Sequence, residues 1–224
     1  MKYRHQLSSD ITCTDHLGKI VCVGRNYADH AKELNNPIPN EPLLFIKPAT
    51  AAVSMLDTVT IPEGRGACHH ELEMAVLIGT ELSAKTAAMQ DEDILSSIAG
   101  VGLALDLTLR DVQDELKEKG QPWERAKAFD GSCPLSNFVG VDGVDLQDLP
   151  IQLYRNGQLQ QLGNTVDMLF SVINLLRDIS SIFTLLPGDV VLTGTPAGVG
   201  PLLKGDKLKG TLDSLICVET LVVS

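Results

Sequence analysis

The chain has 224 residues, of which 44% are hydrophobic and 21% are charged, a composition typical of a globular protein with a full core. Its formal net charge of −11 argues against a general nucleic-acid binder, but it is compatible with an anionic substrate at a locally positive site. We find no long apolar run, no signal peptide and no CxxC pair among the five cysteines, so we expect a cytoplasmic protein with reduced thiols and no membrane contact.

The first predicted elements are an N-terminal arm, a strand and a short helix. Residues 1–18 are polar and weakly patterned, which predicts an extended arm or an edge strand, and residues 19–24 predict a buried strand that ends at a glycine. A helical pattern follows over residues 25–34, with Asn26 as the expected N-cap. A short helix between a glycine and two prolines is typical of a movable lid.

Two residues of this short helix are candidates for chemistry. His30 and Glu33 are spaced i, i+3, so they are neighbours on one helix surface. An exposed helix with a local ion pair is the simpler interpretation of this spacing alone.

Two carboxylates stand at the start of a buried strand. Residues 43–48 and 59–62 predict short strands, and the apolar run 74–79 then follows Glu71 and Glu73. Alternate side chains of a strand share a face, so the two carboxylates share one that becomes apolar immediately afterwards. Carboxylates that enter a buried face need compensation, which a divalent metal ion would supply. The alternative is a polar strand end in solvent.

A third carboxylate lies where the next strand ends. Residues 90–97 predict a helix, residues 98–105 a glycine-containing buried strand, and residues 110–119 an amphipathic helix. Asp106 stands between the last two elements, where it could be a third oxygen ligand of Mg²⁺ or Mn²⁺. It could equally be a helix N-cap, which needs no metal.

The next part of the chain contains one candidate residue. We predict a loop over residues 121–130, in which Lys127 is either an ordinary surface lysine or a functional one. Residues 134–162 predict several short strands, with a hairpin turn at residues 155–158. Residues 169–182 predict a core helix.

The last predicted elements surround a glycine-rich loop. Residues 190–196 predict a strand, and the loop 197–200 has neither the lysine nor the following helix of a phosphate loop. We interpret it as a close backbone approach to a small anion, with hydroxyl and amide donors from Thr195.

Six stretches of the chain match the motifs of one family in the family's order. They are VGRNYADH at 23–30, LFIKP at 44–48, HHELE at 69–73, LDLTLRDVQ at 105–113, WERAK at 123–127 and LTGTPAGVG at 192–200. The sequence therefore resembles the fumarylacetoacetate hydrolase superfamily, and within it the small acylpyruvase and oxaloacetate decarboxylase branch. The resemblance implies an α+β fold, a mixed β-sheet roll with short flanking helices, and a homodimer. We expect residues 18–224 to form the catalytic domain and residues 1–17 an arm or edge strand.

The resemblance also implies roles for particular residues. One Mg²⁺ or Mn²⁺ ion per subunit would be held by Glu71, Glu73 and Asp106. The catalytic residues would be His30 and Glu33 on a mobile lid, together with Lys127, while His69 and His70 would be structural. Substrate contacts are expected from Arg25, Arg110, Gln113 and Thr195.

From these expectations we predict a divalent-metal-dependent C–C hydrolase of acylpyruvates, of the acetylpyruvate or fumarylpyruvate type, that also decarboxylates oxaloacetate. Lys127 would place positive charge near a pyruvate enolate, and His30, oriented by Glu33, would act as general base on a water. The alternative is an isomerase or tautomerase of a small 2-oxo or 2-hydroxy-dienoic dicarboxylic acid, including an oxaloacetate tautomerase. A more distant alternative is a metal-binding module without catalysis.

Overall fold

The apolar run after the two glutamates forms a central strand of the largest sheet. In the computed structural model, which describes residues 3–9, 11, 15–86 and 88–224, strand β6 (Leu72–Ile78) is buried along its whole length. It pairs antiparallel with β7 (Ile98–Leu105) on one side and with β12 (Val190–Leu192) on the other. The seven strands lie in the order β2 (Leu43–Pro48), β1 (Lys19–Gly24), β12, β6, β7, β9 (Cys133–Leu135) and β3 (Ala52–Ser54). The sheet is mixed, because β1 runs parallel to β12 and β3 runs parallel to β9.

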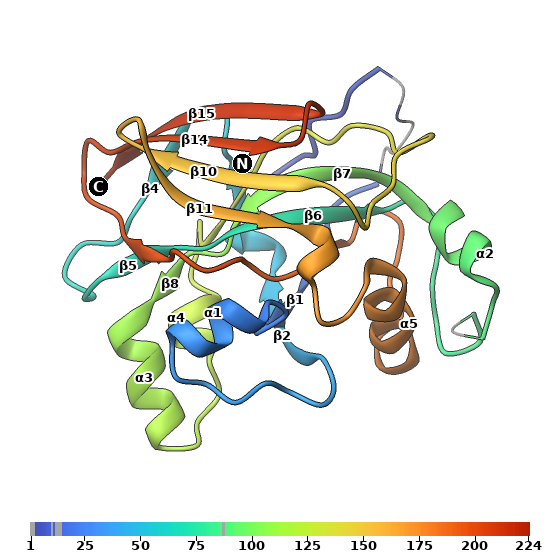
Figure 1. Ribbon diagram of the computed structural model, residues 1–224, viewed down its shortest axis with the longest axis horizontal. Helices are drawn as coiled ribbons and strands as arrows, with labels where there is room; N and C mark the ends of the chain where they lie inside the picture. Colours follow the sequence, from blue (N-terminus) through green and yellow to red (C-terminus); the bar gives the residue numbers. More distant parts are fainter. Residues whose placement is uncertain (1–2, 10, 12–14, 87) are drawn as a thin grey trace.

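Two smaller sheets complete the β-structure. A five-stranded sheet forms the upper layer in Figure 1 and contains β11 (Gln158–Asn164), β10 (Pro150–Arg155), β14 (Lys207–Leu212), β15 (Ile216–Val223) and β4 (Thr58–Thr60), in that order. A three-stranded sheet contains β13 (Gly200–Pro201), β5 (Cys68–His70) and β8 (Thr108–Leu109). The predicted hairpin turn is confirmed between β10 and β11, where Asn156 and Gly157 both have positive φ, as a two-residue turn requires.

Alternate side chains of β6 enter two separate apolar clusters. Met74 belongs to the cluster that includes side chains of the five-stranded sheet. Ala75 and Leu77 belong to the other cluster, which lies against the N-terminal part of the chain. The face that carries Glu73 therefore becomes apolar within two residues, as the sequence predicts.

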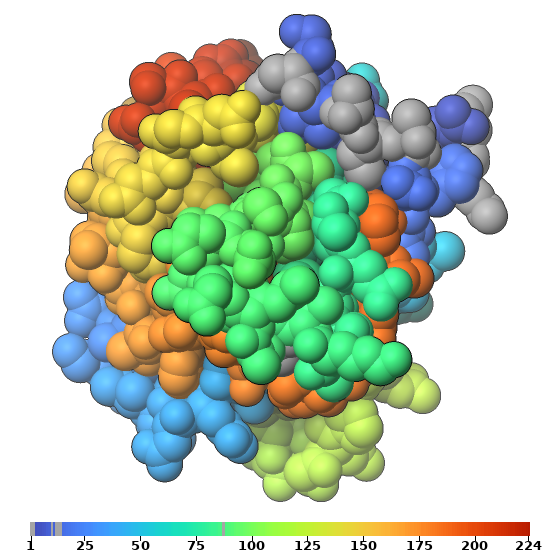
Figure 2. Space-filling model, turned by 90° about the vertical axis from the view of Figure 1, so that its right-hand side faces the viewer, coloured from blue at the N-terminus to red at the C-terminus, as the bar shows by residue number. Residues whose placement is uncertain are grey.

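The short helices lie around the sheets in two groups (Figure 1). Three of them, α1 (Ala28–Glu33), α3 (Arg110–Glu118) and α4 (Glu124–Lys127), lie at one end of the molecule. The other two, α2 (Asp91–Ser96) and α5 (Val172–Ile182), pack together at a side of the sheets, and two 3-10 turns, Ala49–Ala51 and Thr165–Asp167, complete the list. Figure 2 shows the α2 segment in green over this side, with the lid segment in blue and α3 in yellow-green together at its lower end. The expected α+β fold of mixed sheets with short helices is confirmed.

Two local predictions are wrong. Asn26 does not cap helix α1, which begins after Tyr27 without a side-chain cap. The Asn26 amide instead bonds the backbone of Phe170 and Thr193, and so joins the start of the lid to the chain before α5 and after β12. The predicted loop 121–130 contains helix α4, one turn long, which buries Lys127.

The described part of the N-terminal arm is extended and docks by a few contacts. Leu7 forms a single parallel bridge with Phe138, and the His5 Nε2 atom lies 2.8 Å from the Gly188 carbonyl oxygen. Parts of the predicted arm, residues 1–2, 10 and 12–14 with Cys13, lie outside the described residues. Among the helices that the structure describes, none is long and apolar enough to cross a membrane.

Candidate metal centre and active site

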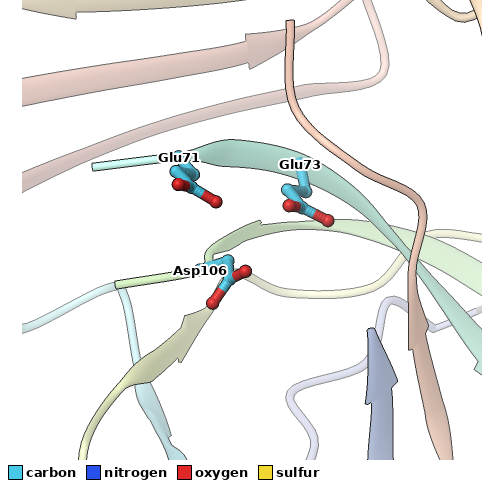
Figure 3. A group of neighbouring side chains, drawn as sticks. All are labelled: Glu71, Glu73 and Asp106. Atoms are coloured by element: carbon cyan, nitrogen blue, oxygen red, sulfur yellow. The ribbon is translucent and has the colours of Figure 1, made fainter. Parts of the chain in front are cut away.

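Three carboxylates meet where β6 and β7 begin and end. The register pairs Leu72 with Leu105, so the residues that flank these two positions come together, and the Asp106 amide donates to the Glu71 carbonyl at 2.8 Å. Glu71 lies between β5 and β6 and Glu73 lies in β6, and both carboxylates point toward the side on which Asp106 lies (Figure 3). One oxygen of each lies within 4.8 Å of the others, and all three residues are at most 4% exposed. The alternatives of a solvated strand end and of a helix cap at Asp106 are therefore wrong, since helix α3 begins after Leu109.

Lys127 compensates part of this negative charge. Its ammonium donates to Glu71 Oε2 at 2.8 Å, to Asp106 Oδ2 at 2.6 Å and to Thr108 Oγ1 at 2.6 Å. The residue is only 3% exposed, so the surface-lysine interpretation is wrong. Arg110 forms a further ion pair with Glu71 through Nη2. Glu71 is thus held between two cations.

Glu71 and Glu73 have different proton affinities, because the cations lie beside Glu71 and not beside Glu73. Burial raises the pKa of Glu71, but Lys127 and Arg110 outweigh it and leave the pKa well below its ordinary value. Burial and the neighbouring charges of Asp106 and Glu71 raise the pKa of Glu73 well above its ordinary value. The only polar contact of the Glu73 carboxylate among the described residues is the Gly194 amide, which donates to Oε2 at 2.7 Å. Glu73 is therefore the carboxylate of the three that the cations of the site compensate least.

The donor set fits a hard divalent cation. All three candidate ligands are carboxylate oxygens, the type that Mg²⁺ and Mn²⁺ prefer. Asp106 Oδ1 is buried and accepts no hydrogen bond from the described residues, although the Lys47 ammonium lies 2.9 Å away in an ion pair. Such an oxygen has a lone pair free for a metal ion. A 2-oxo acid, which presents a carboxylate and a keto oxygen, is a suitable partner for the open positions of a cation held in this way.

Lys47 is a residue of this site whose role sequence reasoning missed. It is fully buried, and its ammonium reaches Ser132 Oγ at 3.0 Å, the Ser132 carbonyl at 3.1 Å and the Lys127 carbonyl, besides Asp106. It therefore fixes the segments that carry Asp106 and Lys127. A lysine at the end of a buried strand was a signal for such a role, because a buried ammonium needs a matching set of acceptors.

Helix α1, the expected lid, places His30 in the same cavity as the carboxylates. His30 is buried, so the interpretation of an exposed local pair is wrong for the histidine. Its Nδ1 atom lies 3.4 Å from Glu33 Oε2, and the Glu33 carboxylate accepts from the Gly198 amide at 3.0 Å and 3.2 Å. Burial lowers the pKa of His30, although Glu71 and Glu33 partly offset this effect. The lowered pKa favours the neutral imidazole, which is able to accept a proton.

A single cavity brings the predicted residues together. Those that line it are Arg25, His30, Glu71, Glu73, Asp106, Arg110, Gln113, Lys127 and Thr195. Glu33 is not in the lining and reaches the cavity through His30. Arg25 has a φ of 61°, a left-handed conformation that is uncommon for a residue with a side chain and is often found at functional sites.

Hydrogen bonds already engage three of the predicted substrate contacts. On α3, Arg110 Nη1 donates to Gln113 Oε1 at 2.6 Å. The Thr195 hydroxyl donates to the Leu72 carbonyl at 2.8 Å and accepts from Gln161 Nε2 at 2.7 Å. Its hydroxyl proton is therefore committed to the protein, contrary to the expectation of a free hydroxyl donor.

The glycine-rich loop also differs from its prediction. The Gly198 amide in this loop and the Gly194 amide shortly before it donate to the protein's own carboxylates, those of Glu33 and Glu73, rather than to a free anion. Behind the loop, His70 is fully buried, and burial lowers its pKa to about 4 even though the hydrogen bond to Gln161 raises it. A neutral, buried histidine with this partner suits the structural role expected for it.

Comparison with known proteins gives concordant matches over most of the chain. A family model described as fumarylacetoacetate (FAA) hydrolase C-terminal matches residues 19–223. Oxaloacetate tautomerase YcgM of Escherichia coli is 51% identical over 199 residues, which cover 88% of this chain and 89% of that protein. The mitochondrial oxaloacetate tautomerase FAHD1 of Bos taurus is 43% identical over 201 residues, 89% of each chain.

A solved structure adds a ligand to the comparison. The crystal structure of fumarylpyruvate hydrolase from Pseudomonas aeruginosa in complex with Mn²⁺ and pyruvate superimposes with a TM-score of 0.87 at 33% sequence identity. The match covers 98% of this chain and 94% of that one.

Proposed function

The chain belongs to the fumarylacetoacetate hydrolase family of enzymes, and we propose that it is a divalent-metal-dependent tautomerase of oxaloacetate. The relatives named above favour this alternative over the acylpyruvate hydrolase that the sequence alone suggests first. The observation that supports it most directly is one cavity that contains three carboxylates, a buried ammonium and a neutral imidazole. Mg²⁺ or Mn²⁺, one ion per subunit, is the proposed cofactor.

Tautomerisation moves one proton and breaks no bond between carbon atoms. The enol form of oxaloacetate loses the proton of its enol hydroxyl, and a proton is added to C3 to give the keto form. A divalent cation, when bound to Glu71, Glu73 and Asp106, supplies positive charge that stabilises the enolate oxygen. No water has to attack, so this reaction needs less of the site than hydrolysis does.

The residues of the chain would divide the remaining work. Lys127, fixed by Glu71 and Asp106, adds a second positive charge beside the enolate. His30 accepts a proton from one atom of the substrate and returns it to the other. Glu33 accepts from Nδ1 of the imidazole, which leaves Nε2 as the atom that exchanges the proton.

The proposed substrate contacts come from residues that lie beside the carboxylates in the same cavity. Arg110 and Gln113 form one hydrogen-bonded unit on helix α3, and Thr195 lies on the loop after β12. Because the Thr195 hydroxyl is occupied by the protein, we assign its contact to the backbone amide.

Hydrolysis of an acylpyruvate is the second candidate function. It is supported by the similarity to a fumarylpyruvate hydrolase that was solved with Mn²⁺ and pyruvate. The same His30 would then act as general base on a water, and decarboxylation of oxaloacetate would need no base. A role as a non-catalytic metal-binding module is disfavoured, because a decayed site would not be expected to keep all of these side chains together.

A direct test follows the decay of enol oxaloacetate by its ultraviolet absorbance. Protein stripped with a chelator should be inactive, and added Mg²⁺ or Mn²⁺ should restore a rate well above that of the metal ion alone. Added Mg²⁺ or Mn²⁺ should not restore the activity of the Glu73→Gln variant. Pyruvate release from acetylpyruvate and from oxaloacetate is measured in parallel; release without enol decay would replace the proposed function by hydrolysis or decarboxylation. The homodimer and the cytoplasmic location stay predictions.

A further inference from the structure

Helix α3 places a third polar side chain on the cavity wall. Arg110, Gln113 and Lys117 are spaced i, i+3 and i+7, so they lie along one face of the helix, and all three line the cavity. Arg110 and Gln113 are engaged with each other and with Glu71. Lys117 lies about one turn further along the same face, on the side away from the carboxylates.

The contacts of Lys117 leave its charge available. Its ammonium lies 3.3 Å from Asp114 Oδ1, in an i, i+3 pair whose acidic side chain is 57% exposed. Exposed pairs of this kind contribute little, so a ligand anion can replace Asp114 at small cost. The Lys117 side chain itself is 22% exposed, which gives an incoming carboxylate a partly desolvated partner.

Arg25 lies near Lys117 on the cavity wall and, unlike Lys117, has no counter-charge among the described residues. Its guanidinium has no hydrogen-bond or ion-pair partner among the residues described. The pKa of Lys117 is lowered, first by burial and also by the positive charges of Arg110 and Arg25, although Asp114 raises it. Mutual repulsion of this kind is relieved when an anion binds between the cations.

The charged side chains of the cavity form two groups, one around the carboxylates and one at Lys117 and Arg25. The carboxylates of Glu71, Glu73 and Asp106 form one wall with Lys127 and Arg110, and a divalent cation bound there would make that wall positive. Lys117 and Arg25 then remain as excess positive charge. A monoanionic 2-oxo acid would use its single carboxylate at the cation and leave these two residues without a partner.

We propose that Lys117 and Arg25 bind the second carboxylate of a dicarboxylic 2-oxo acid and make the site selective for dicarboxylates over monocarboxylates. This inference rests on the proposed function and specifies its substrate class. The first carboxylate and the keto oxygen would face a divalent cation held by Glu71, Glu73 and Asp106, and the distal carboxylate would contact Lys117 and Arg25. Oxaloacetate satisfies both ends.

Binding of two stable ligands to the Mn²⁺-loaded protein tests this without turnover. DL-lactate and DL-malate share a 2-hydroxy acid group and differ in the distal carboxylate, so calorimetric titration with each isolates the contribution of that group. Wild-type protein should bind malate at least about tenfold more tightly than lactate, as a charge-assisted pair allows. Lys117→Met should weaken malate about tenfold and leave lactate unchanged.

Matched variants separate a specific contact from a general loss of charge. Lys119→Met removes an exposed lysine at the end of the same helix, whose one ion pair among the described residues is with exposed Glu115, and should leave the affinity for both ligands unchanged. Arg25→Asn removes the guanidinium and retains a residue that tolerates positive φ, and it should also weaken malate selectively. Melting temperatures of all variants check that they fold.

Each outcome decides for or against the inference. The inference is overturned if wild type and Lys117→Met bind malate with equal affinity, or if the substitution lowers the affinities for malate and lactate equally. A wild-type protein that does not prefer malate overturns it as well. If the selective loss is found while wild-type protein leaves enol oxaloacetate unchanged, the inference on dicarboxylate binding stands and the tautomerase proposal fails. If wild-type protein is an active tautomerase but Lys117→Met shows no selective loss of malate affinity, the tautomerase proposal stands and the inference on dicarboxylate binding fails.

Discussion

Asp106 is the residue at which the buried charges of the site meet. One of its oxygens lies 2.6 Å from the Lys127 ammonium, and the other lies 2.9 Å from that of Lys47. It also belongs to the carboxylate triad. A single side chain therefore connects the candidate metal ligands, the candidate catalytic lysine and a lysine that contacts only the protein.

Lys47→Met should destabilise the protein strongly. The substitution keeps the volume but leaves Asp106 and the carbonyl acceptors around the ammonium short of a partner. Loss of one member of a buried ion pair costs about 3–5 kcal/mol. We expect the free energy of unfolding in urea to fall by about 3 kcal/mol. Lys32→Met, which removes an exposed pair with Asp29, is the control and should change little.

Glu33→Gln should move the acid limb of the pH–rate profile to lower pH. The Glu33 carboxylate favours the protonated form of His30, so its removal lowers further a pKa that burial already lowers. The active neutral imidazole would then persist to lower pH. Asp29→Asn, on the same helix but exposed, should not shift the profile of kcat/KM. A shift to higher pH would contradict the assignment of the pair.

At the scale of elements, strands with a strong apolar pattern were predicted correctly, whereas the cap of α1 and the single-turn helix α4 were not. The strands at 19–24, 43–48 and 98–105 are confirmed, because each is a short apolar run that ends at a clear break. The cap of α1 was missed because Asn26 bonds segments distant in sequence. Helix α4 was missed because a single turn has no periodicity to detect.

The loop after β12 joins the lid to the metal centre, and one glycine is required for it. A Cβ atom at Gly198 would lie 2.0 Å from the Gln160 carbonyl oxygen, and φ there is +98°. Gly198→Ala should displace the loop, weaken the amide bond to Glu33 and cost about 1–3 kcal/mol of stability. Hydrogen exchange of the α1 amides should become faster.

Gly205→Ala provides the matched comparison. Its φ is +90°, but no atom lies within 4 Å of the added carbon, so the substitution introduces backbone strain alone. It should lower stability without affecting exchange in α1. Equal exchange of α1 in both variants would contradict the proposed link between loop and lid.

At the scale of the whole molecule, the site depends on residues that are far apart in sequence. The triad and its cations come from β2, the ends of β6 and β7, and helices α3 and α4. Composition and periodicity indicated many short strands, but not the order of the seven-stranded sheet, because its pairing joins distant segments. The roll and the set of residues that meet in the cavity were predictable only through matching motifs, which fix residue types at positions that local patterns leave open.

Divalent cations should stabilise the whole fold. Binding to the native triad alone raises stability by RT ln(1 + [L]/Kd), about 2.7 kcal/mol at a hundredfold excess over Kd. For a chain of this length that corresponds to a rise in melting temperature of roughly 5–10 °C. Differential scanning calorimetry with Mn²⁺ or EDTA should show the shift in wild type and not in Glu73→Gln. An equal shift in both would place the ion elsewhere.

The parallel pairing of β1 with β12 has a consequence for synthesis on the ribosome. Residues 25–189 lie between these two strands, so β1 cannot pair with β12 until the ribosome has synthesised all of them. At about 5–20 residues per second, this wait is roughly ten to thirty seconds. During that time one edge of an apolar strand is unpaired in the nascent chain, a state in which association with other chains competes with folding. A molecular chaperone that shields the first fifty residues would therefore protect the part of the protein most at risk before translation ends.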